Sequence, residues 1–243
     1  MSSQRVLRHD DLDQLVDEVA EAWTRTVLRL QETQEVINIG LTGGQTANRV
    51  YERFAHVAPG RGLRPEGIRL WWSDECFLPT SDPQRNALQA LAILARTLPI
   101  SRTETHPMPG SDGQDDPDEA AFAYARDLGE TVLDICLLGL GTDGHVAGLF
   151  PGRVPSDASS SQVVGITDAP VGCQERISLS YAALNRSERI WVVASGEPKA
   201  DALARTLAKD PDSPASHLDP RGELVWWVDE DAALALPSYH CEL

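Results

Sequence analysis

The feature that most constrains the fold of this chain is the alternation of short apolar runs with longer amphipathic segments. The apolar runs predict strands at residues 35–41, 68–73, 133–138, 176–180, 189–195 and 224–228. The amphipathic segments predict helices at residues 11–30, 46–56, 85–95, 117–128 and 197–208. Such alternation is typical of a mostly parallel sheet with helices on both faces, and nearly unbroken apolar strands fit a sheet that is covered on both sides. The sequence therefore predicts an α/β fold with a doubly wound, Rossmann-like sheet.

Two long polar connections interrupt this alternation, at residues 108–119 and 151–162. Each could link two domains. Both, however, lie between strand and helix patterns of unchanged composition, so excursions from one domain are the better interpretation. A chain of 243 residues, 42% of them hydrophobic, is long enough to bury a substantial core. We expect a single domain over residues 1–243.

The charge of the chain restricts its partners. There are 37 acidic and 21 basic residues, which give a formal net charge of −16 at pH 7. A surface of this kind repels phosphate backbones and anionic lipid, so neither nucleic acid nor a membrane is an expected partner. The first residues contain no apolar signal region, and no run approaches the ~18 apolar residues of a membrane span.

The cysteines are Cys76, Cys136, Cys173 and Cys241, which lie far apart and form no C-x-x-C pair. Cys136 lies in an apolar run, where a reduced and buried thiol is the ordinary state. This spacing indicates neither a zinc site nor a disulfide framework. We expect a protein of the reducing cytoplasm.

The loops that follow the predicted strands are the places to look for a ligand site, because ligands of open parallel sheets bind outside the carboxyl ends of the strands. After the first strand, Gly43, Gly44, Gln45 and Thr46 lead into a helix. Paired glycines and a helix start offer free N–H groups and a favourable dipole to a phosphate. The alternative is a tight turn with Thr46 as the helix cap, and this segment alone does not separate the two. The Walker pattern is absent, because no G-K-[ST] follows.

A pair of carboxylates, Asp74 and Glu75, follows the second strand. Asp74 is a candidate for binding a substrate at this edge of the sheet. Capping or solvation of a loop is the commoner role of such residues, so the pair gains weight only from the other loops.

The loop "GLGTDGHVAGLFPG" (139–152) contains a formal G-x-G-x-x-G in Gly139, Gly141 and Gly144. A dinucleotide fingerprint needs a helix that runs on from the third glycine, but Pro151 follows only seven positions later. Asp143 would also repel a pyrophosphate in this turn. We therefore reject a dinucleotide cofactor and expect a differently built loop.

The same loop places His145 two residues after Asp143. Imidazole suits proton transfer near neutral pH, and a neighbouring carboxylate fixes its tautomer and supports its charged form. The glycines let backbone N–H groups approach a developing oxyanion. A capping Asp beside a surface His is the alternative. The position at the carboxyl end of a strand favours the catalytic interpretation of His145 and Asp143.

Two cations complete the candidate set. Lys199 is one of only two lysines and lies in the first turn of a predicted helix, where a cation is electrostatically misplaced unless an anion binds beside it. Arg176 opens the strand "RISLS". For Arg176, a local ion pair at a solvated strand end is an almost equally good explanation.

Together, "LTGGQT", "SDECFLP…QRN", "GLGTDGHVAGLFP", "RISL" and "SGEPKADAL" resemble the 6-phosphogluconolactonase family in order and spacing. The resemblance covers nearly the whole chain. It implies a fold shared with the glucosamine-6-phosphate deaminases and hydrolysis of 6-phosphoglucono-1,5-lactone in the oxidative pentose phosphate pathway, without a metal or organic cofactor. In this interpretation His145 activates water for attack on C1 and returns the proton to the ring oxygen, Asp143 orients His145, and the glycine loop, Lys199 and Arg176 hold the phosphate.

The sequence departs from the family pattern at two positions. The family usually has Arg where Cys76 stands, so a cation near the substrate is missing or is supplied by Arg85 or Arg176. Gln45 stands where the family usually has Ser, which removes a hydroxyl contact to phosphate.

Two other functions stay open at this stage. Deaminases that resemble this chain carry Asn-Glu-Pro shortly after the His, with the Glu assisting ring opening, whereas this chain has Leu149, Phe150 and Pro151. A non-catalytic sugar-phosphate sensor is the third possibility, although the retention of both Asp143 and His145 argues against it.

Overall fold

The central element of the structure is a seven-stranded sheet in which all neighbouring strands are parallel. The computed structural model describes residues 3–153 and 161–237. In spatial order, the strands are β1 (Ser3–His9), β10 (Glu223–Asp229), β9 (Arg189–Ala194), β6 (Ile135–Gly139), β2 (Ile37–Leu41), β3 (Ile68–Trp72) and β5 (Thr105–His106). The predicted α/β class with a mostly parallel sheet is confirmed.

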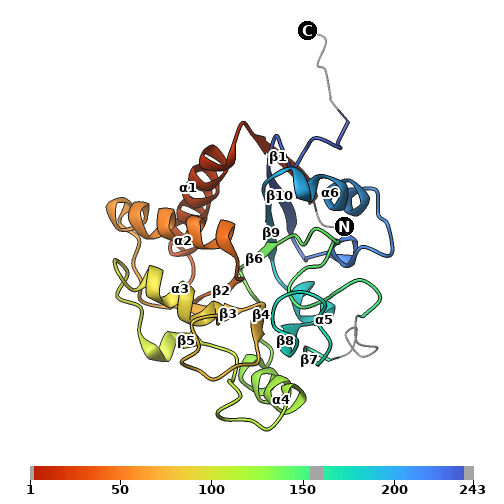
Figure 1. Ribbon diagram of the computed structural model, residues 1–243. Coiled ribbons are helices and arrows are strands. Elements are labelled where there is room, and N and C mark those ends of the chain that lie inside the picture. Colours follow the sequence, from red (N-terminus) through yellow and green to blue (C-terminus); the bar gives the residue numbers. More distant parts are fainter. Residues whose placement is uncertain (1–2, 154–160, 238–243) are drawn as a thin grey trace.

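Helices cover both faces of this sheet (Figure 1). On one side lie α1 (Leu12–Leu30), α2 (Gln45–Val57) and α3 (Asn86–Leu94), and on the other lie α4 (Pro117–Leu128), α5 (Tyr181–Leu184) and α6 (Ala200–Leu207). Short 3-10 turns are η1 (Pro59–Arg61), η2 (Arg102–Glu104), η3 (Glu197–Lys199) and η4 (Pro214–His217). The carboxylates of Asp11 and Asp116 accept hydrogen bonds from the first turns of α1 and α4, which explains where these helices begin. Within the described ranges, no helix is both long and apolar enough to cross a bilayer.

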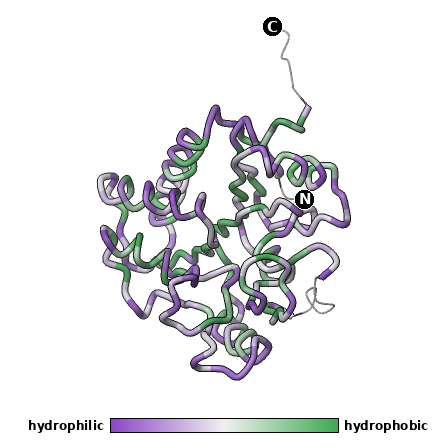
Figure 2. Tube along the Cα trace, viewed as in Figure 1, coloured by the Kyte–Doolittle hydropathy of each residue, from purple (hydrophilic) through white to green (hydrophobic). Residues whose placement is uncertain are grey.

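The core fills the space between the sheet and its helices, and Figure 2 shows the strands as its most apolar part. Trp72 of β3 and Trp226 of β10 are buried. Trp23 of α1 stacks on Phe54 of α2 with 3.9 Å between ring centroids, which fixes these two helices against each other. The strands are nearly continuously buried, as a sheet covered on both faces requires.

A second, antiparallel sheet stands beside the first and contains β4 (Asp74–Cys76), β8 (Arg176–Leu179) and β7 (Val163–Ile166). The sequence predicts the strand at 176–180 but not its membership of a separate sheet. The register places Cys76 opposite Arg176. Because β4 directly follows β3 in the chain, this pairing brings Arg176, the first residue of β8, close to the carboxyl end of β3.

The cysteines differ from the expectation in one respect. Cys76 and Cys173 form a disulfide with 5.6 Å between their Cα atoms, so the prediction that no disulfide is present is wrong. The two residues are 97 positions apart, and the pairing of β4 with β8 brings them together. Cys136 is a free, buried thiol as predicted, and burial raises its pKa to about 12. Cys241 and part of the 151–162 connection lie outside the described residues.

The direction in which the chain crosses the sheet reverses between β2 and β6. From β2 the chain continues to β3 and β5 on one side, whereas β6 leads to β9 and β10 on the other. Outside the carboxyl ends of β2 and β6 lies the crevice in which doubly wound folds bind ligands. The glycine loop after β2 and the loop with His145 after β6 both open into it.

Candidate active site

A cavity of about 320 Å³ occupies this crevice. Its walls come from the segments that follow β2, β6 and β9, together with residues of the antiparallel sheet. Polar or charged side chains in its lining are Thr42, Gln45, Thr46, Tyr51, Asp74, Asn86, His145, Arg176, Ser195 and Lys199. The fold thus brings all of the residues predicted for the site to one cavity except Asp143 and Arg85.

The amino end of α2 forms one wall. Gly44 is the N-cap of α2 with φ of 105°, and no side chain caps the helix. Thr46 is therefore not the cap, and the first-turn N–H groups remain open to the cavity. Gly43 packs so closely that a Cβ atom there would lie 1.9 Å from Oδ1 of Asn86. Only glycine at position 43 allows the loop to approach α3 in this way.

His145 and Asp143 form a hydrogen-bonded pair at the mouth of the β6 loop. Nδ1 of His145 lies 2.6 Å from Oδ1 of Asp143, and the His145 main-chain N–H donates to the same oxygen at 3.0 Å. The carboxylate can only accept, so Nδ1 carries a proton, and in the neutral ring Nε2 keeps its lone pair. His145 lines the cavity and its side chain is 26% exposed. The pair has the arrangement of a general base with an orienting acid.

The backbone of this loop is shaped around the pair. A Cβ atom on Gly141 would lie 2.0 Å from Nδ1 of His145, and the Gly141 N–H donates to the His145 carbonyl at 2.8 Å. Ala147 has φ of 48°, a conformation that costs an L-residue free energy and occurs at functional sites. Residues 140–152 contain no helix, so the crossover helix of a dinucleotide site is absent there, as predicted.

Asp143 stays ionised beside His145. Burial on its own raises the pKa of this carboxyl, but the N–H donor and the imidazole of His145 outweigh burial, and the net pKa lies below the ordinary value. The Asp143 carboxylate does not line the cavity itself. Its place is behind His145, where it orients the ring and supports the charged imidazolium.

Asp74 and Arg176 reach the cavity as an ion pair. Nη1 of Arg176 lies 2.8 Å from Oδ2 of Asp74, and both side chains are largely buried. The guanidinium also lies 5.9 Å above the ring of Phe150. Both candidates are therefore at the cavity, but each neutralises much of the charge of the other.

Lys199 ends η3, the turn that follows β9. Burial lowers the pKa of its ammonium, and the nearby Asp143 carboxylate opposes that shift. It forms no ion pair with any residue the structure describes. The preceding turn is held by Asp229, whose carboxylate accepts from the Ser195 hydroxyl and from the Gly196 N–H. Lys199 is thus a half-buried cation at the cavity that lies near Asp143 but forms no ion pair among the described residues.

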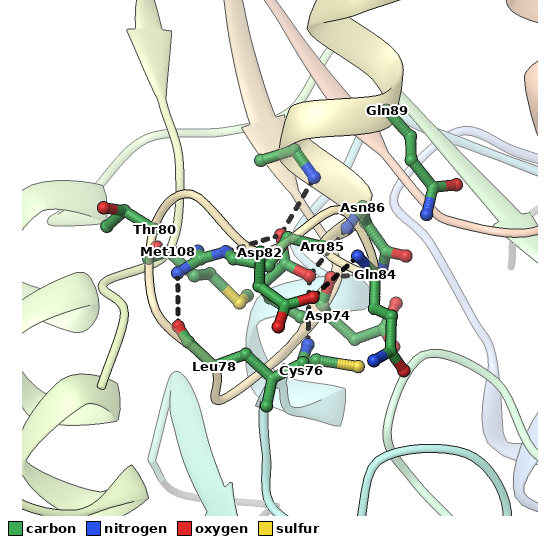
Figure 3. Close-up of polar contacts among 12 residues, drawn as sticks. Asp74, Cys76, Leu78, Thr80, Asp82, Gln84, Arg85, Asn86, Gln89 and Met108 are labelled. Atoms are coloured by element: carbon green, nitrogen blue, oxygen red, sulfur yellow. Dashed lines mark hydrogen bonds and ion pairs between the residues drawn. The ribbon is translucent and has the colours of Figure 1, made fainter. Parts of the chain in front are cut away.

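Arg85 does not lie at the cavity. Figure 3 shows its polar contacts. Its guanidinium donates to the carbonyl groups of Leu78 and Met108, its Nε lies 3.5 Å from Glu75, and the side chain is 2% exposed. Glu75 in turn accepts from the N–H groups of Asn86 and Ala87 at the start of α3. We therefore reassign Arg85 from substrate binding to a buried structural pair, because Glu75 and two loop carbonyls occupy its donors.

The structure adds residues that the sequence does not single out. Tyr51 is buried at the cavity, where its hydroxyl donates to the Thr42 carbonyl and accepts from the Thr42 N–H, so it fixes the start of the glycine loop. Asn86 donates to the Asp74 carbonyl and contacts the same loop. No motif includes Tyr51, but the helical periodicity of α2 places it on the buried face, so its burial could have been predicted from the sequence. Among residues 3–153 and 161–237, no group of three or more His, Cys, Asp or Glu side chains has a metal-binding arrangement.

The fold and the site together define a Rossmann-like α/β protein whose cavity joins a His–Asp pair to an open helix end and a half-buried lysine. The chain belongs to the family of glucosamine-6-phosphate isomerases and 6-phosphogluconolactonases, whose model matches residues 10–227. It is 32% identical to 6-phosphogluconolactonase of Streptomyces coelicolor over 94% of this chain and 93% of that protein. It is 37% identical to 6-phosphogluconolactonase of Mycobacterium tuberculosis over 82% of this chain and 85% of that one.

Solved structures show the same fold. 6-Phosphogluconolactonase of Thermotoga maritima superposes with a TM-score of 0.81 and 25% identity over 94% of this chain and all of that one. A monomeric glucosamine-6-phosphate deaminase superposes with a TM-score of 0.83 and 20% identity over 95% and 99% of the two chains. The lactonase and the deaminase share this architecture, so fold alone does not separate the two activities.

Proposed function

We propose that this protein hydrolyses 6-phosphoglucono-1,5-lactone to 6-phosphogluconate, a reaction of the oxidative pentose phosphate pathway. The observation that carries the proposal is His145, which faces the cavity with Nε2 free while Asp143 holds Nδ1 at 2.6 Å. The relatives named as 6-phosphogluconolactonases support the substrate. The substrate is a small phosphorylated lactone, and the reaction needs neither a metal nor an organic cofactor.

The phosphate binds between the amino end of α2 and Lys199. The N–H groups at Gly44, Gln45 and Thr46 point to the anion along the helix dipole, and Lys199 supplies a positive charge that no ion pair engages among the described residues. Arg176 adds donors from the opposite wall. Asp74, an acceptor held by Arg176, is placed to bind sugar hydroxyl groups.

The reaction proceeds by general acid–base catalysis. Nε2 of His145 takes a proton from a water molecule as its oxygen attacks the C1 carbonyl, and Asp143 stabilises the imidazolium that forms. N–H groups of the surrounding loop donate hydrogen bonds to the developing oxyanion. His145 then returns the proton to the ring oxygen as the ester bond breaks. Proton transfer of this kind contributes typically about 10²–10⁴-fold, a suitable share for a reactive ester.

Ring-opening isomerisation or deamination fits the site less well. The resemblance to deaminases calls for a carboxylate that assists the catalytic His, but this chain has Phe150 at the corresponding place. Phe150 is buried, and its ring centroid lies 4.6 Å from that of His145. At the position where a deaminase needs a carboxylate, this chain therefore has an apolar ring.

A direct assay distinguishes these functions. Freshly made 6-phosphogluconolactone is mixed with the protein, and its decay is compared with the spontaneous rate; glucosamine 6-phosphate is offered in a parallel reaction. The proposal requires accelerated decay of the lactone and no ammonia release. Deamination without lactone hydrolysis would overturn it, and saturable binding of 6-phosphogluconate without any reaction would favour the sensor.

We also propose that residues 1–243 work as one domain and that the protein acts in the cytoplasm, without nucleic acid or a membrane as partner. The acidic composition supports the last point. Fractionation of cells that produce the protein tests the location.

A further inference from the structure

The Cys76–Cys173 disulfide joins two segments that both bind Arg176. Cys76 lies on β4, two residues after Asp74, and is paired with Arg176 across the antiparallel sheet. Cys173 lies in the loop that leads into β8. The covalent link therefore fixes this loop to the strand that carries Asp74.

The guanidinium of Arg176 takes its acceptors from both of these segments. Nη1 donates to Asp74 Oδ2 at 2.8 Å, Nε to the Cys173 carbonyl at 3.3 Å, and Nη2 to the Val171 carbonyl at 3.2 Å. An arginine has five N–H donors, so these contacts leave two for a ligand. Since Arg176 lines the cavity, the position of residues 171–173 determines where those two donors point.

Residues 171–173 pack tightly around the guanidinium of Arg176. Gly172 has φ of 72°, and a Cβ atom there would lie 2.7 Å from Nη2 of Arg176. The Val171 side chain is 58% exposed. Other main-chain contacts of the loop that the structure describes are at its base. The Ala169 N–H donates to the Gln174 carbonyl and the Phe77 N–H to the Glu175 carbonyl, each at 3.0 Å, and Arg153 donates to the Asp168 carbonyl at 2.7 Å. The disulfide is the restraint nearest to the two carbonyl groups that bind Arg176.

We infer that the Cys76–Cys173 disulfide is a redox-sensitive positioning element for Arg176, and that its reduction weakens binding of the phosphorylated substrate. The inference rests on the proposed function, because Arg176 is placed there as a substrate contact. With the disulfide intact, the carbonyl groups of residues 171 and 173 hold the guanidinium against the cavity. After reduction, the loop is released and the guanidinium loses two of its three protein acceptors.

The redox step is ordinary thiol–disulfide exchange with a dithiol reductant. Cys173 is partly exposed and Cys76 is buried, so the reductant thiolate attacks Sγ of Cys173 and the Cys76 sulfur leaves as a thiolate. The second thiol of the reductant then displaces Cys173. The protein gains two electrons and two protons, and the dithiol is oxidised to its own disulfide. Disulfides that form in a cytoplasm are usually transient and serve catalysis or redox sensing, which agrees with such a role.

His145 and Asp143 hydrogen-bond to each other, and among the described residues neither has a hydrogen bond or ion pair with Arg176 or the cysteines. The apolar ring of Phe150 lies between them, 4.6 Å from the His145 ring and 5.9 Å from the Arg176 guanidinium. Reduction is therefore expected to change KM and to leave kcat nearly constant. If the disulfide were merely structural, its reduction would lower the thermal midpoint without this separation of KM from kcat.

The test compares the air-oxidised and the dithiothreitol-reduced protein, with the cystine checked by mass spectrometry after alkylation. Reduction should raise KM for 6-phosphogluconolactone roughly three- to tenfold, the scale of a weakened hydrogen bond, with kcat changed less than about twofold. Cys173→Ser should show the raised KM in either buffer. Arg176→Met should have a high KM that no longer responds to reductant.

The inference is overturned if verified reduction leaves KM unchanged, if kcat alone falls, or if Arg176→Met still responds to reductant. Binding of 6-phosphogluconate, measured by calorimetry in both redox states, separates this inference from the proposed function. A redox-dependent affinity without lactone hydrolysis would refute the lactonase and keep the positioning role. Hydrolysis with equal affinity in both states would refute only the positioning role.

Discussion

Nδ1 of His145 and Oδ1 of Asp143 are 2.6 Å apart, and the same Asp143 oxygen accepts the His145 main-chain N–H. One carboxylate oxygen thus fixes both the ring and the backbone of the proposed base. Replacing Asp143 by Asn removes the negative charge. It also replaces one acceptor oxygen of the carboxylate by an NH2 group, which donates hydrogen bonds. We expect Asp143→Asn to lower kcat by about 10²-fold or more with a small change in KM, because the substrate contacts stay in place.

Steady-state kinetics on fresh lactone measures this effect. Asp13→Asn is a suitable control, because Asp13 is an exposed partner of Arg49 on the helix surface. Equal kcat values for Asp143→Asn and the wild type would mean that the carboxylate does not assist the reaction.

Gly141 is predicted to be irreplaceable for catalysis. A methyl group at this position would lie 2.0 Å from Nδ1 of His145 and 2.6 Å from Oδ1 of Asp143, so Gly141→Ala must separate the pair or move the loop. We expect loss of most of the activity while the far-ultraviolet circular dichroism stays native. Gly60→Ala, where a Cβ meets nothing within 4 Å, should behave as the wild type. An active Gly141→Ala protein would contradict the proposed geometry.

The pH dependence of ligand binding should report on Lys199. Its pKa is lowered by burial, so the ammonium loses its proton at a lower pH than an exposed lysine does, and affinity for a phosphorylated ligand falls with it. We expect the Kd of 6-phosphogluconate in the wild type to rise already below the pH of ~10.4 at which an exposed lysine titrates. The Lys199→Arg variant stays charged over this range and should show no such rise. Parallel curves for the two proteins would remove Lys199 from the site.

Arg85 should contribute to stability and not to binding. Arg85→Met leaves the buried Glu75 carboxylate without its cation and leaves two carbonyl groups without a donor. Breaking such a pair costs about 3–5 kcal/mol of the free energy of unfolding. Urea denaturation measures the loss, and KM for the lactone should change little in the folded fraction. A large rise in KM at unchanged stability would restore Arg85 to the substrate site.

The sequence predicts the parts of this fold that are long, apolar and periodic. All six predicted strands and five predicted helices are present, with their ends shifted by a few residues. β1 is missed because it is a polar edge strand, paired only with β10 and largely exposed. β4 and β5 have three and two residues, too few for a period to be visible. Their place depends on tertiary pairing, which a local pattern does not contain.

The candidate site follows the same division. His145, Lys199 and the loop at Gly43 are predictable because they follow parallel strands, whose carboxyl ends meet at one edge of the sheet. Arg85 is not, because its role depends on which acceptors a folded loop places around it. The disulfide depends on the register between β4 and β8, so the spacing of the cysteines along the chain does not predict it.

We propose that His145 is the base that activates water for lactone hydrolysis. The most direct test follows the decay of fresh 6-phosphogluconolactone with wild-type protein, His145→Asn and the control His56→Asn, in which an exposed histidine of α2 is changed. We expect His145→Asn to lose about 10²–10⁴-fold in kcat, near the spontaneous rate, and still to bind 6-phosphogluconate, whereas His56→Asn should stay fully active. Hydrolysis by His145→Asn at the wild-type rate would contradict it.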